Sequence, residues 1–452
     1  MDGVPLLADR PFRRNRTSQR REGRVTVWPR DWQRSFRNPM ARNAGWLMAG
    51  QGAGLLLQVA YFIILARLLG AVQYGIYAGA FAFTGLVAQY GGLGTGTVFL
   101  RYVSGDRREF SVYWGNILAV TLVAAGSLIV LLRIVGWRVL NPASASLVLL
   151  AAVANCLCGQ LTLESSRIFQ AFEQMRTTAV LNLLTNLLRT IAAAGMLLVL
   201  GRASAWQWAA ASATVSAIGA LLAAGTITAR FGRPEFHPAL FAKRGPEGLG
   251  YAFATSTASV YNDLDKTMLS HYGLNLANGI YTMAYRVIDV ATIPILSIRD
   301  AAMPRLFQRG RSNLAASAEL SYRLLRRAAP IGVAASVAVF LAAPLIPRIL
   351  GPGFAESVAA ARWLCLIPAF RGVHQMTGSA LTGAGLQSYR TNAQLTAAAL
   401  NFGLNLWLIP RFGWYGAAWS SLATDAALGG MNWGLLQWLI LRGQRNPVAE
   451  SN

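Results

Sequence analysis

The sequence predicts an all-α polytopic membrane protein, with about twelve transmembrane helices in two pseudo-symmetric six-helix lobes around a central cavity. Composition is the first observation behind this prediction. Of the 452 residues, 54% are hydrophobic and only 13% are charged, and the mean hydropathy is +0.40. A soluble domain of this length needs far fewer apolar residues. The other two observations are a series of apolar runs and an internal repeat.

The apolar runs are close to the roughly 20 residues that cross a bilayer as a helix. The predicted spans are 44–67, 76–99, 112–135, 143–164, 177–200, 204–229, 249–272, 279–301, 328–350, 360–382, 391–410 and 414–440. Prolines interrupt several of them, at Pro294, Pro344, Pro347 and Pro368. A helix bundle tolerates such breaks because neighbouring helices satisfy the freed backbone groups.

Basic residues predict the orientation of the spans. Of the 41 Lys and Arg residues, 30 fall on one side of the predicted membrane, 11 of them in the segment 10–42, and 7 fall on the other side. Because positively charged loops stay in the cytoplasm, both termini are expected there. Much of the +23 net charge is therefore explained by topology, and no nucleic-acid partner is expected.

The spans divide the chain into five parts. We expect a basic cytoplasmic arm 1–42, an N-lobe 43–231, a polar cytoplasmic linker 232–248, a C-lobe 249–442 and a cytoplasmic tail 443–452. The arm has no apolar core of a signal peptide, so the first span is expected to act as an uncleaved anchor. The arm is interpreted as a topogenic tail, or as a segment that lies on anionic lipid.

An internal repeat relates the two lobes. The tripeptide Gly75-Ile76-Tyr77 recurs as Gly279-Ile280-Tyr281, 204 residues later, and Arg101 and Arg305 are separated by the same offset. Two matches at one offset indicate a duplication. Six spans separate the repeats, so both begin on the same side of the membrane and are parallel repeats. In transporters with such repeats the substrate path commonly lies between them.

Three stretches resemble a known family. They are "LARLLGAVQYGIYAGAFAF" at 65–83, "YNDLDKTML" at 261–269 with "NGIYTMAYRV" at 278–287, and "LTGAGLQSYRTNAQLTAAALNFGLNLWLIPRFGWYGAAWSSL" at 381–422. These stretches resemble the polysaccharide and O-antigen flippases of the multidrug/oligosaccharidyl-lipid/polysaccharide exporter superfamily. The resemblance covers roughly residues 43–442.

The resemblance implies a V-shaped, two-lobed bundle in the bacterial inner membrane that works by alternating access. Such proteins move undecaprenyl-diphosphate-linked oligosaccharides from the cytoplasmic to the periplasmic leaflet, for surface polysaccharides such as lipopolysaccharide O-antigen and exopolysaccharide. Arg and Lys typically line their cavity. The implied partners are the lipid-linked glycan, membrane lipids and a polysaccharide polymerase or glycosyltransferase. A monomer is expected because the path would lie within one chain.

Charged residues inside the spans are the candidates for function, because a charge in hydrocarbon costs on the order of 3 kcal/mol or more. Seven of the eight belong to the C-lobe. The set is Arg189, Asp263, Asp265, Lys266, Arg286, Asp289, Arg371 and Asp425. Asp263 with Lys266, and Arg286 with Asp289, are three residues apart and can pair on one helix face.

Asp265 has no such partner in its own helix. A buried carboxylate without a neighbouring cation holds a proton readily, so Asp265 is the first candidate for coupling to H⁺ or Na⁺, followed by Asp263 and Asp289. The alternative is that these acids form ion pairs that hold the seventh and eighth spans together. No other cofactor and no metal are expected.

Arginine and lysine are the candidates for binding substrate. The guanidinium group makes bidentate, charge-assisted contacts with a diphosphate. Arg286, Arg371 and Lys266 lie within spans, and Arg101 and Arg305 lie near span ends. For the last two, the alternative is an anchor whose charged head reaches the membrane surface.

Three other patterns favour structural roles. His374 lies one helical turn from Arg371 and is interpreted mainly as a packed histidine. The cluster "GGLGTG" at 91–96 lacks the strand and helix of a phosphate-binding loop and is interpreted as a bend or close helix approach. The three cysteines are interpreted as small apolar filler.

Three other functions remain open. A drug or metabolite antiporter of the same superfamily would share the two lobes, although the N-lobe shows no clear acid within its spans. A lipid II flippase shares every feature used above. An enzyme such as a polymerase or ligase is not expected, because the predicted outer loops are short and His271 and Glu356 are their only acid or histidine residues.

Overall fold

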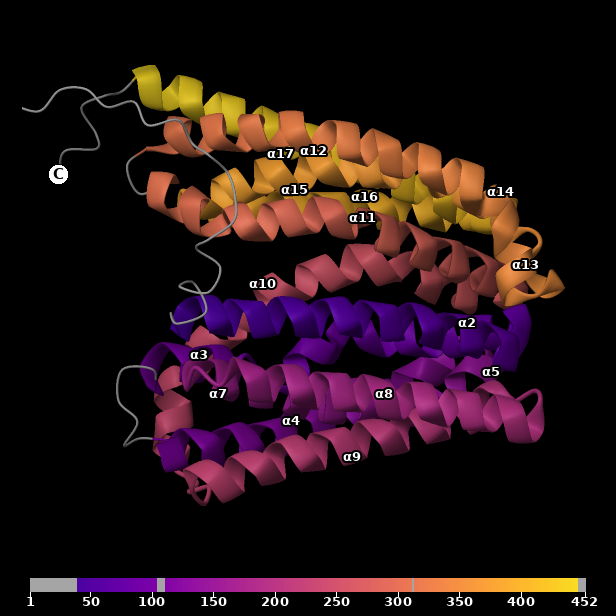
Figure 1. The fold of residues 1–452 in the computed structure, drawn as a ribbon, viewed down its shortest axis with the longest axis horizontal. Helices are drawn as coiled ribbons and strands as arrows, with labels where there is room; N and C mark the ends of the chain where they lie inside the picture. The colour runs from indigo at the N-terminus through magenta and orange to yellow at the C-terminus, as the bar shows by residue number, and fades with distance from the viewer. Residues whose placement is uncertain (1–38, 104–109, 311–312, 446–452) are drawn as a thin grey trace, which may run out of the picture.

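The computed structural model describes residues 39–103, 110–310 and 313–445, and every regular element in these ranges is a helix. The helices run side by side along one axis and form two groups, α2 to α9 and α11 to α17, with α10 between them (Figure 1). This arrangement confirms the all-α, two-lobed fold. The predicted arm 1–42 and tail 443–452 lie almost entirely outside the described residues.

The N-lobe holds the first six spans. Its elements are α2 (Pro39–Val87), η1 (Ala88–Gly91), α3 (Thr95–Val103), α4 (Phe110–Val139), α5 (Pro142–Ala145), α6 (Val148–Ala152), η3 (Val153–Gly159), α7 (Gln160–Ala171), α8 (Met175–Leu200) and α9 (Ala205–Phe231). Gly70 interrupts α2 with φ 65° and ψ 172°, a conformation that favours glycine, and separates the first two spans. The connection between the predicted spans 44–67 and 76–99 is therefore a sharp change of direction at Gly70 within α2, with no separate loop.

The C-lobe holds the other six spans. Its elements are α10 (Pro238–His271), α11 (Asn275–Gly310), α12 (Leu314–Ala342), η4 (Ala343–Leu345), α13 (Ile346–Leu350), η5 (Pro352–Phe354), α14 (Ser357–Leu364), α15 (Ile367–Gly383), α16 (Gln387–Phe412) and α17 (Trp414–Arg445). Pro294 lies inside α11, whereas Pro347 and Pro368 lie in the first turns of α13 and α15, where a helix tolerates proline. Helix α10 begins at Pro238, inside the segment 232–248 that was expected to be a linker.

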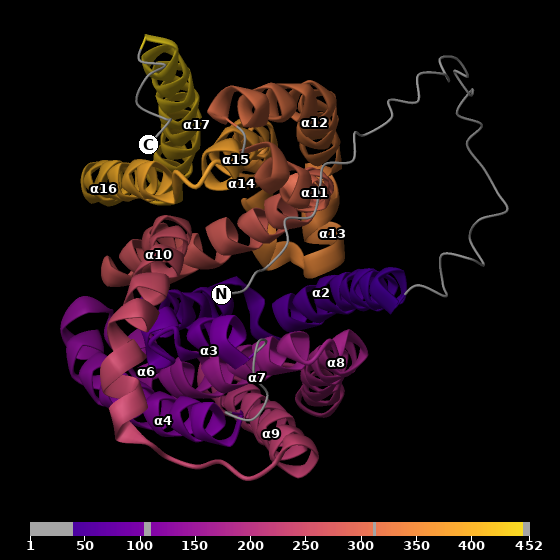
Figure 2. The same cartoon turned by 90° about the vertical axis from the view of Figure 1, so that its left-hand side faces the viewer.

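The helix bundle has two ends, and each is named here after the residues that lie at it. The Gly70 end holds the turn at Gly70 and the connections 201–204, 272–274 and 351–356, and the linker end holds 172–174, 232–237 and 384–386 (Figure 1). Helix α10 crosses from one lobe to the other (Figure 2). At the linker end it packs on η1 and α3, and Gly94 approaches the Gly248 carbonyl closely. The 91–96 cluster is thus a bend and a close approach, as the sequence indicated.

The repeated glycines meet at the Gly70 end. A β-carbon at Gly75 would clash with the Asn275 carbonyl oxygen, and a β-carbon at Gly279 would clash with the Ala71 carbonyl oxygen. Ala71 and Asn275 are also 204 residues apart, so each half of this contact repeats the other half. A contact that repeats itself in this way is built around a twofold axis, here a pseudo-axis within one chain. Small residues allow the two backbones to touch.

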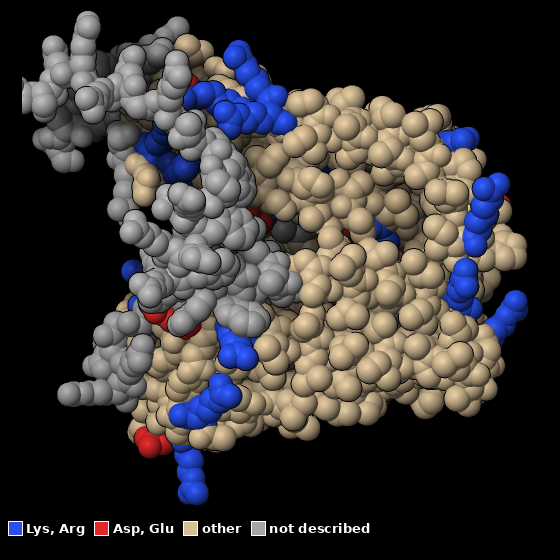
Figure 3. All heavy atoms as spheres, viewed as in Figure 1, with Lys and Arg blue, Asp and Glu red and all other residues tan. Residues whose placement is uncertain are grey.

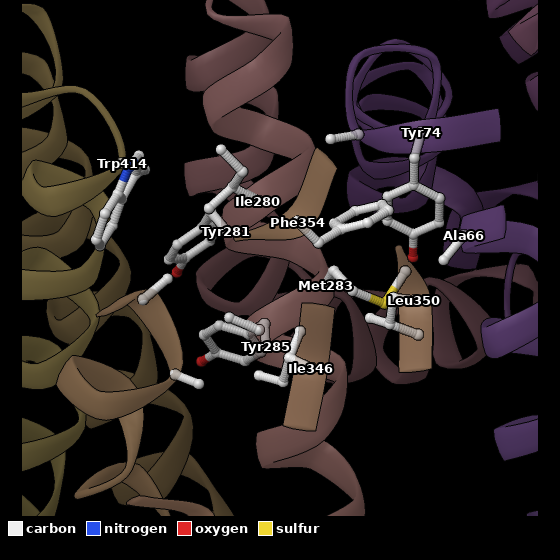
Figure 4. Packing of buried hydrophobic residues seen from close by; sticks show 14 of the residues in the cluster. Ala66, Tyr74, Ile280, Tyr281, Met283, Tyr285, Ile346, Leu350, Phe354 and Trp414 are labelled. Atoms are coloured by element: carbon white, nitrogen blue, oxygen red, sulfur yellow. The ribbon is translucent and has the colours of Figure 1, made fainter. Parts of the chain in front are cut away.

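An apolar cluster closes the Gly70 end around this contact. Figure 4 shows Tyr74 of α2 beside Phe354, and Met283 of α11 beside Leu350. The rings of Tyr74 and Phe354 meet edge to face with centroids 6.4 Å apart. Burial of these side chains on both sides of the pseudo-axis holds the lobes together at this end.

Within the part of the chain that the structure describes, seven helical runs are long and apolar enough to cross a membrane: Gly52–Val103, Phe110–Val139, Val148–Ala171, Met175–Leu200, Ala205–Phe231, Asn275–Gly310 and Leu314–Leu350. Because 52–103 contains parts of two passes, these runs correspond to eight of the predicted spans. The remaining four, within α10 and α14 to α17, carry buried polar groups such as Asp265, Asn401, Asn405 and Asp425 that lower their hydropathy. Exposed leucines and valines cover the outer faces of α4, α8 and α12. Charged side chains gather mainly toward the two ends of the visible face (Figure 3).

Candidate functional site

Three adjoining cavities lie where the lobes face each other: residues of both lobes line a central cavity and an N-lobe cavity, and C-lobe residues alone line a C-lobe cavity. The central cavity measures about 620 Å³, the C-lobe cavity about 310 Å³ and the N-lobe cavity about 820 Å³. Lys266 and Arg286 line both the central and the C-lobe cavities, whereas Asn155 and Arg189 line both the central and the N-lobe cavities. Figure 3 shows the hollow between the two halves of the molecule, with charged side chains inside it.

Lys266 of α10 contributes a firmly held cation. Its Nζ lies 2.9 Å from Asp263 Oδ1, also donates to the Asn262 carbonyl oxygen, and lies 4.9 Å from the centre of the Tyr285 ring. The predicted pairing of Asp263 with Lys266 is present. Only 6% of the Lys266 side chain is exposed, because α11 covers it, whereas 32% of the Asp263 side chain remains open to the cavity.

Arg286 of α11 faces the N-lobe across the central cavity. It pairs with Asp289 at 3.4 Å, as its spacing predicted, and its guanidinium carbon lies 5.0 Å from the centre of the Phe62 ring on α2. The side chain is 38% exposed, and its Nε has no hydrogen-bond partner among the described residues. Because more than a third of the side chain is open to the central cavity, Arg286 is positioned to donate to a ligand through its exposed nitrogens.

Arg371 of α15 connects the cavity to the interior of the C-lobe. Its guanidinium group lies 3.0 Å from Asp289 and 2.9 Å from the Tyr285 hydroxyl, and its Nε lies 4.0 Å from Asp425. Behind it, His374 Nε2 lies 3.3 Å from Asp425. This network of charges joins three helices, α11, α15 and α17.

The charges that line the central and C-lobe cavities are predominantly positive. The cations are Arg189, Lys266, Arg286, Arg299 and Arg371, and the carboxylates are Asp263 and Asp289. Asp265, Asp300 and Asp425 pair with Lys266, Arg299 and Arg371 from outside this lining, but the surface open to a ligand still carries more cations than carboxylates. Such a surface favours an anionic ligand, because the field in a low-dielectric cleft is weakly screened.

Asp265 differs from the expectation in two respects. It does not line any of the three cavities, and its side chain is 1% exposed. It accepts hydrogen bonds from the Tyr281 hydroxyl and from Ser421 Oγ at 3.2 Å, and it lies 3.8 Å from Lys266 Nζ. The prediction that Asp265 lacks a partner in its own helix is therefore wrong, because Lys266, which pairs with Asp263, also approaches Asp265.

Arg101 and Arg305 lie away from the cavities. Arg101, at the linker end, is 60% exposed in its side chain and pairs with Glu247 at 2.5 Å. Arg305 is exposed near the same end of α11. Neither side chain lines the three cavities.

Sequence reasoning missed several polar residues in the N-lobe. Arg189 was identified as a charge within a span but was not chosen as a site residue. Glu164 was overlooked because the fourth span was predicted to end there, whereas α7 continues to Ala171 and buries it; the carboxylate pairs with Arg167 at 3.0 Å. The amides that line the cavities are neutral, so a search for charged residues within the spans could not find them. A π-helical turn, η3, presents Asn155 to two of these cavities, and such turns often occur at functional sites.

Comparisons with known proteins support this interpretation of the fold. A model of the family described as "Polysaccharide biosynthesis protein" matches residues 40–309, more than half of the chain. No curated protein matches the sequence.

Solved structures share the architecture at low sequence identity. The chain is similar to an inward-facing multidrug resistance MATE family transporter of the MOP superfamily, with a TM-score of 0.70 and 14% identity over 88% of this chain and 96% of that chain. It is similar to an outward-facing MATE family transporter with a TM-score of 0.57 and 14% identity, over 90% and 96% of the two chains. The lipid II flippase MurJ, in an inward closed conformation, gives a TM-score of 0.69 and 12% identity, over 86% and 87%. This chain is accordingly a multi-pass membrane protein with the fold of MATE transporters and MurJ, and it belongs to the polysaccharide biosynthesis protein family.

Proposed function

We propose that this protein is an alternating-access flippase that moves undecaprenyl-diphosphate-linked oligosaccharide from the cytoplasmic to the periplasmic leaflet. The observation that carries the proposal is the predominance of cations on the lining of the central and C-lobe cavities, where the Arg286 side chain is 38% exposed. A diphosphate matches these groups because guanidinium forks bind its oxygens in pairs. Membership of a polysaccharide biosynthesis family supports a glycan as the attached cargo.

The proposed substrate-binding residues are Arg286, Arg371 and Lys266. Arg101 and Arg305 are better explained as surface charges at the cytoplasmic membrane boundary, since neither reaches a cavity. A cation antiporter fits the site less well, because five positive groups would repel a cationic drug. A lipid II flippase remains the second candidate, because its substrate carries the same diphosphate and MurJ has the same fold.

An enzymatic role is not proposed. The two candidate groups near the Gly70 end both have structural partners: His271 Nδ1 contacts the Val139 carbonyl oxygen at 2.5 Å, and Glu356 accepts a hydrogen bond from Trp414 at 3.2 Å. They lie in different connections, and the structure gives no contact between them.

The Gly70 end is proposed to face the periplasm and the linker end the cytoplasm of a bacterial inner membrane. The excess of basic residues on the linker side supports this orientation. Closure at the Gly70 end then corresponds to a cytoplasm-facing state. A fluorescent protein fused after Asn452 should fluoresce, whereas a periplasmic alkaline phosphatase fused there should be inactive. The reverse result would overturn the orientation.

Ion coupling is proposed through the C-lobe acids, with H⁺ or Na⁺ as the driving ion. Asp263 and Asp289 line the C-lobe cavity and contact its cations, Lys266 and Arg371. Asp265 lies behind Lys266, at 3.8 Å from its Nζ, close enough to influence the charge of the lysine. Proteoliposomes with an imposed proton or sodium gradient test this proposal. If Asp263→Asn, Asp265→Asn and Asp289→Asn all keep gradient-driven transport, the acids are not coupling residues.

The first experiment on function is depletion of the protein in its host, followed by mass spectrometry of undecaprenyl-diphosphate-linked oligosaccharides. A membrane-impermeant glycan-modifying reagent separates the two leaflets. A complete repeat unit that accumulates facing the cytoplasm supports the proposal and identifies the cargo. Unchanged amounts and sidedness would overturn it. The same cells allow a search for a polymerase or glycosyltransferase partner, and light scattering of the purified protein tests the expected monomer.

A further inference from the structure

The N-lobe cavity is polar, yet its polarity comes mainly from neutral side chains. Gln58, Asn155, Asn182 and Asn186 line it, and Arg189 is the only charged group among the described residues of its wall. This lining differs from that of the C-lobe cavity, where six of ten lining residues are charged. Two chemically distinct regions therefore adjoin within one path between the lobes.

Helix α8 presents a polar stripe to this cavity. Thr178, Asn182 and Asn186 are four residues apart and share one face of the helix, while Leu184 lies on the opposite, exposed face. The side chain of Asn182 is exposed and that of Asn186 is half-buried, and both line the cavity. A polar group in the hydrocarbon region without a partner is costly, so the stripe is positioned for water and a polar ligand.

The π-helical turn η3 and Arg189, which also belongs to α8, add further hydrogen-bonding groups. Asn155 donates to the Phe81 carbonyl oxygen at 3.1 Å and to Thr84 Oγ1 at 2.8 Å, which leaves its own carbonyl oxygen as an acceptor. Arg189 donates to Ser216 at 3.0 Å, and its buried Nε has no partner among the described residues. The cavity thus offers acceptors and donors from two helices and a π-helical turn.

We infer that the N-lobe cavity is the glycan subsite, which binds the sugars of the lipid-linked oligosaccharide while the C-lobe cations bind its diphosphate. The inference rests on the proposed function. Sugar hydroxyls donate and accept hydrogen bonds, and an amide does both through one planar group. A cationic drug finds no carboxylate among the described residues of this wall, and the polar lining disfavours a polyprenyl chain. The volume of about 820 Å³ suits a small oligosaccharide.

Binding measurements on the full-length protein in nanodiscs test the inference with two probes. One is undecaprenyl diphosphate, and the other is the undecaprenyl-diphosphate-linked oligosaccharide fraction extracted from the host. The variants are Asn182→Ala/Asn186→Ala and its two single substitutions, with Leu184→Ala as a control on the opposite face of α8 and Arg286→Ala as a variant of the diphosphate site. Size-exclusion profiles confirm that each variant is folded.

The double variant is expected to bind the glycosylated lipid about tenfold more weakly, as for the loss of one or two hydrogen bonds. It should bind the bare lipid diphosphate like the wild type. Leu184→Ala should leave both affinities unchanged, and Arg286→Ala should weaken both. If the amide variants bind the glycosylated lipid normally, or weaken both probes equally, the glycan subsite is wrong although the flippase proposal stands. If the wild type binds neither probe, both proposals fail.

Discussion

Individual charged residues in this protein differ in what surrounds them, and that difference separates binding from structural roles. Arg286 keeps an exposed guanidinium group and an unpartnered Nε, whereas Arg371 is 11% exposed and is held by Asp289, Tyr285 and Asp425. An exposed cation can exchange its contacts for those of a ligand. A cation enclosed by carboxylates, such as Arg371, also orders the helices around it, and it can meet a ligand only through the small part of its side chain that lines the C-lobe cavity.

The first prediction concerns Arg286. Arg286→Ala is expected to lower transport about tenfold or more, because a charge-assisted hydrogen bond to a diphosphate contributes roughly 1.5–3 kcal/mol. Arg286→Lys should restore part of the loss, since a lysine keeps the charge without the planar fork. Flux of lipid-linked oligosaccharide in proteoliposomes is the measurement. Arg305→Ala is the matched control, and equal losses in both variants would contradict the assignment.

The second prediction concerns the charge network behind Arg371. Asp425→Ala removes the acid next to Arg371 and His374 and is expected to destabilise the C-lobe by about 1–3 kcal/mol, because His374 loses its buried partner while Arg371 keeps Asp289. Thermal unfolding in detergent measures the change. Asp300→Ala removes a 65% exposed partner of Arg299 and should cost less than about 1 kcal/mol. An Asp425→Ala protein as stable as the control would show that the network does not hold the helices.

At the scale of elements, the contact between the second pass of α2 and the start of α11 determines which end of the molecule is closed. The two backbones touch at Gly75 and Gly279, and the apolar cluster around Tyr74 and Phe354 packs beside them. The proposed alternating access requires this contact to open. The described state would therefore be stabilised by an interface that the proposed transport cycle must break.

The third prediction tests this interface. Gly75→Ala and Gly279→Ala should each destabilise the closed Gly70 end by roughly 1–3 kcal/mol, because the added methyl group overlaps a carbonyl oxygen. By the pseudo-twofold relation the two effects should be similar. The opening is measured in a Tyr74→Cys background, as the rate at which a thiol reagent labels this cysteine in intact cells. Gly403→Ala in α16, where a β-carbon meets no atom within 4 Å, is the control. If only one of the two glycines matters, the symmetric contact does not govern closure.

At the scale of the whole molecule, the two lobes enclose a path. Its wall is rich in cations on the C-lobe side and lined mainly by neutral amides on the N-lobe side. The lobes meet tightly at the Gly70 end, and at the linker end α10 supplies the main contacts between them. A rigid-body motion about the closed end would therefore alter the distance between the lobes at the linker end most.

The fourth prediction follows from this geometry. Gly52 of α2 and Ser297 of α11 line the N-lobe cavity from opposite lobes. Spin labels at these positions should move closer when lipid-linked oligosaccharide and an ion gradient are supplied, as the linker end closes. Labels at Val180 and Ile218, which are both exposed within the N-lobe, should keep their separation. A constant distance between 52 and 297 under all conditions would contradict alternating access.

Most of the fold was predictable because the bilayer constrains it strongly. Apolar runs of fixed length, the basic loops and the 204-residue repeat are properties of the chain itself, so the spans and the duplication could be recognised directly. The pairs Asp263 with Lys266 and Arg286 with Asp289 were also predictable, since both are local on a helix. The end of the fourth span was not, and Glu164 was missed for that reason.

The amino-acid sequence by itself determined the membrane class, the two lobes and most of the intramembrane charges, although not Glu164. Tertiary packing decided which of those charges face the path. Asp265 is enclosed by Tyr281 and Ser421, while Arg189 and the neutral amides of α8 reach a cavity. A helix position specifies the direction of a side chain relative to its own axis, but whether that direction meets a neighbouring helix or an opening depends on how distant segments pack.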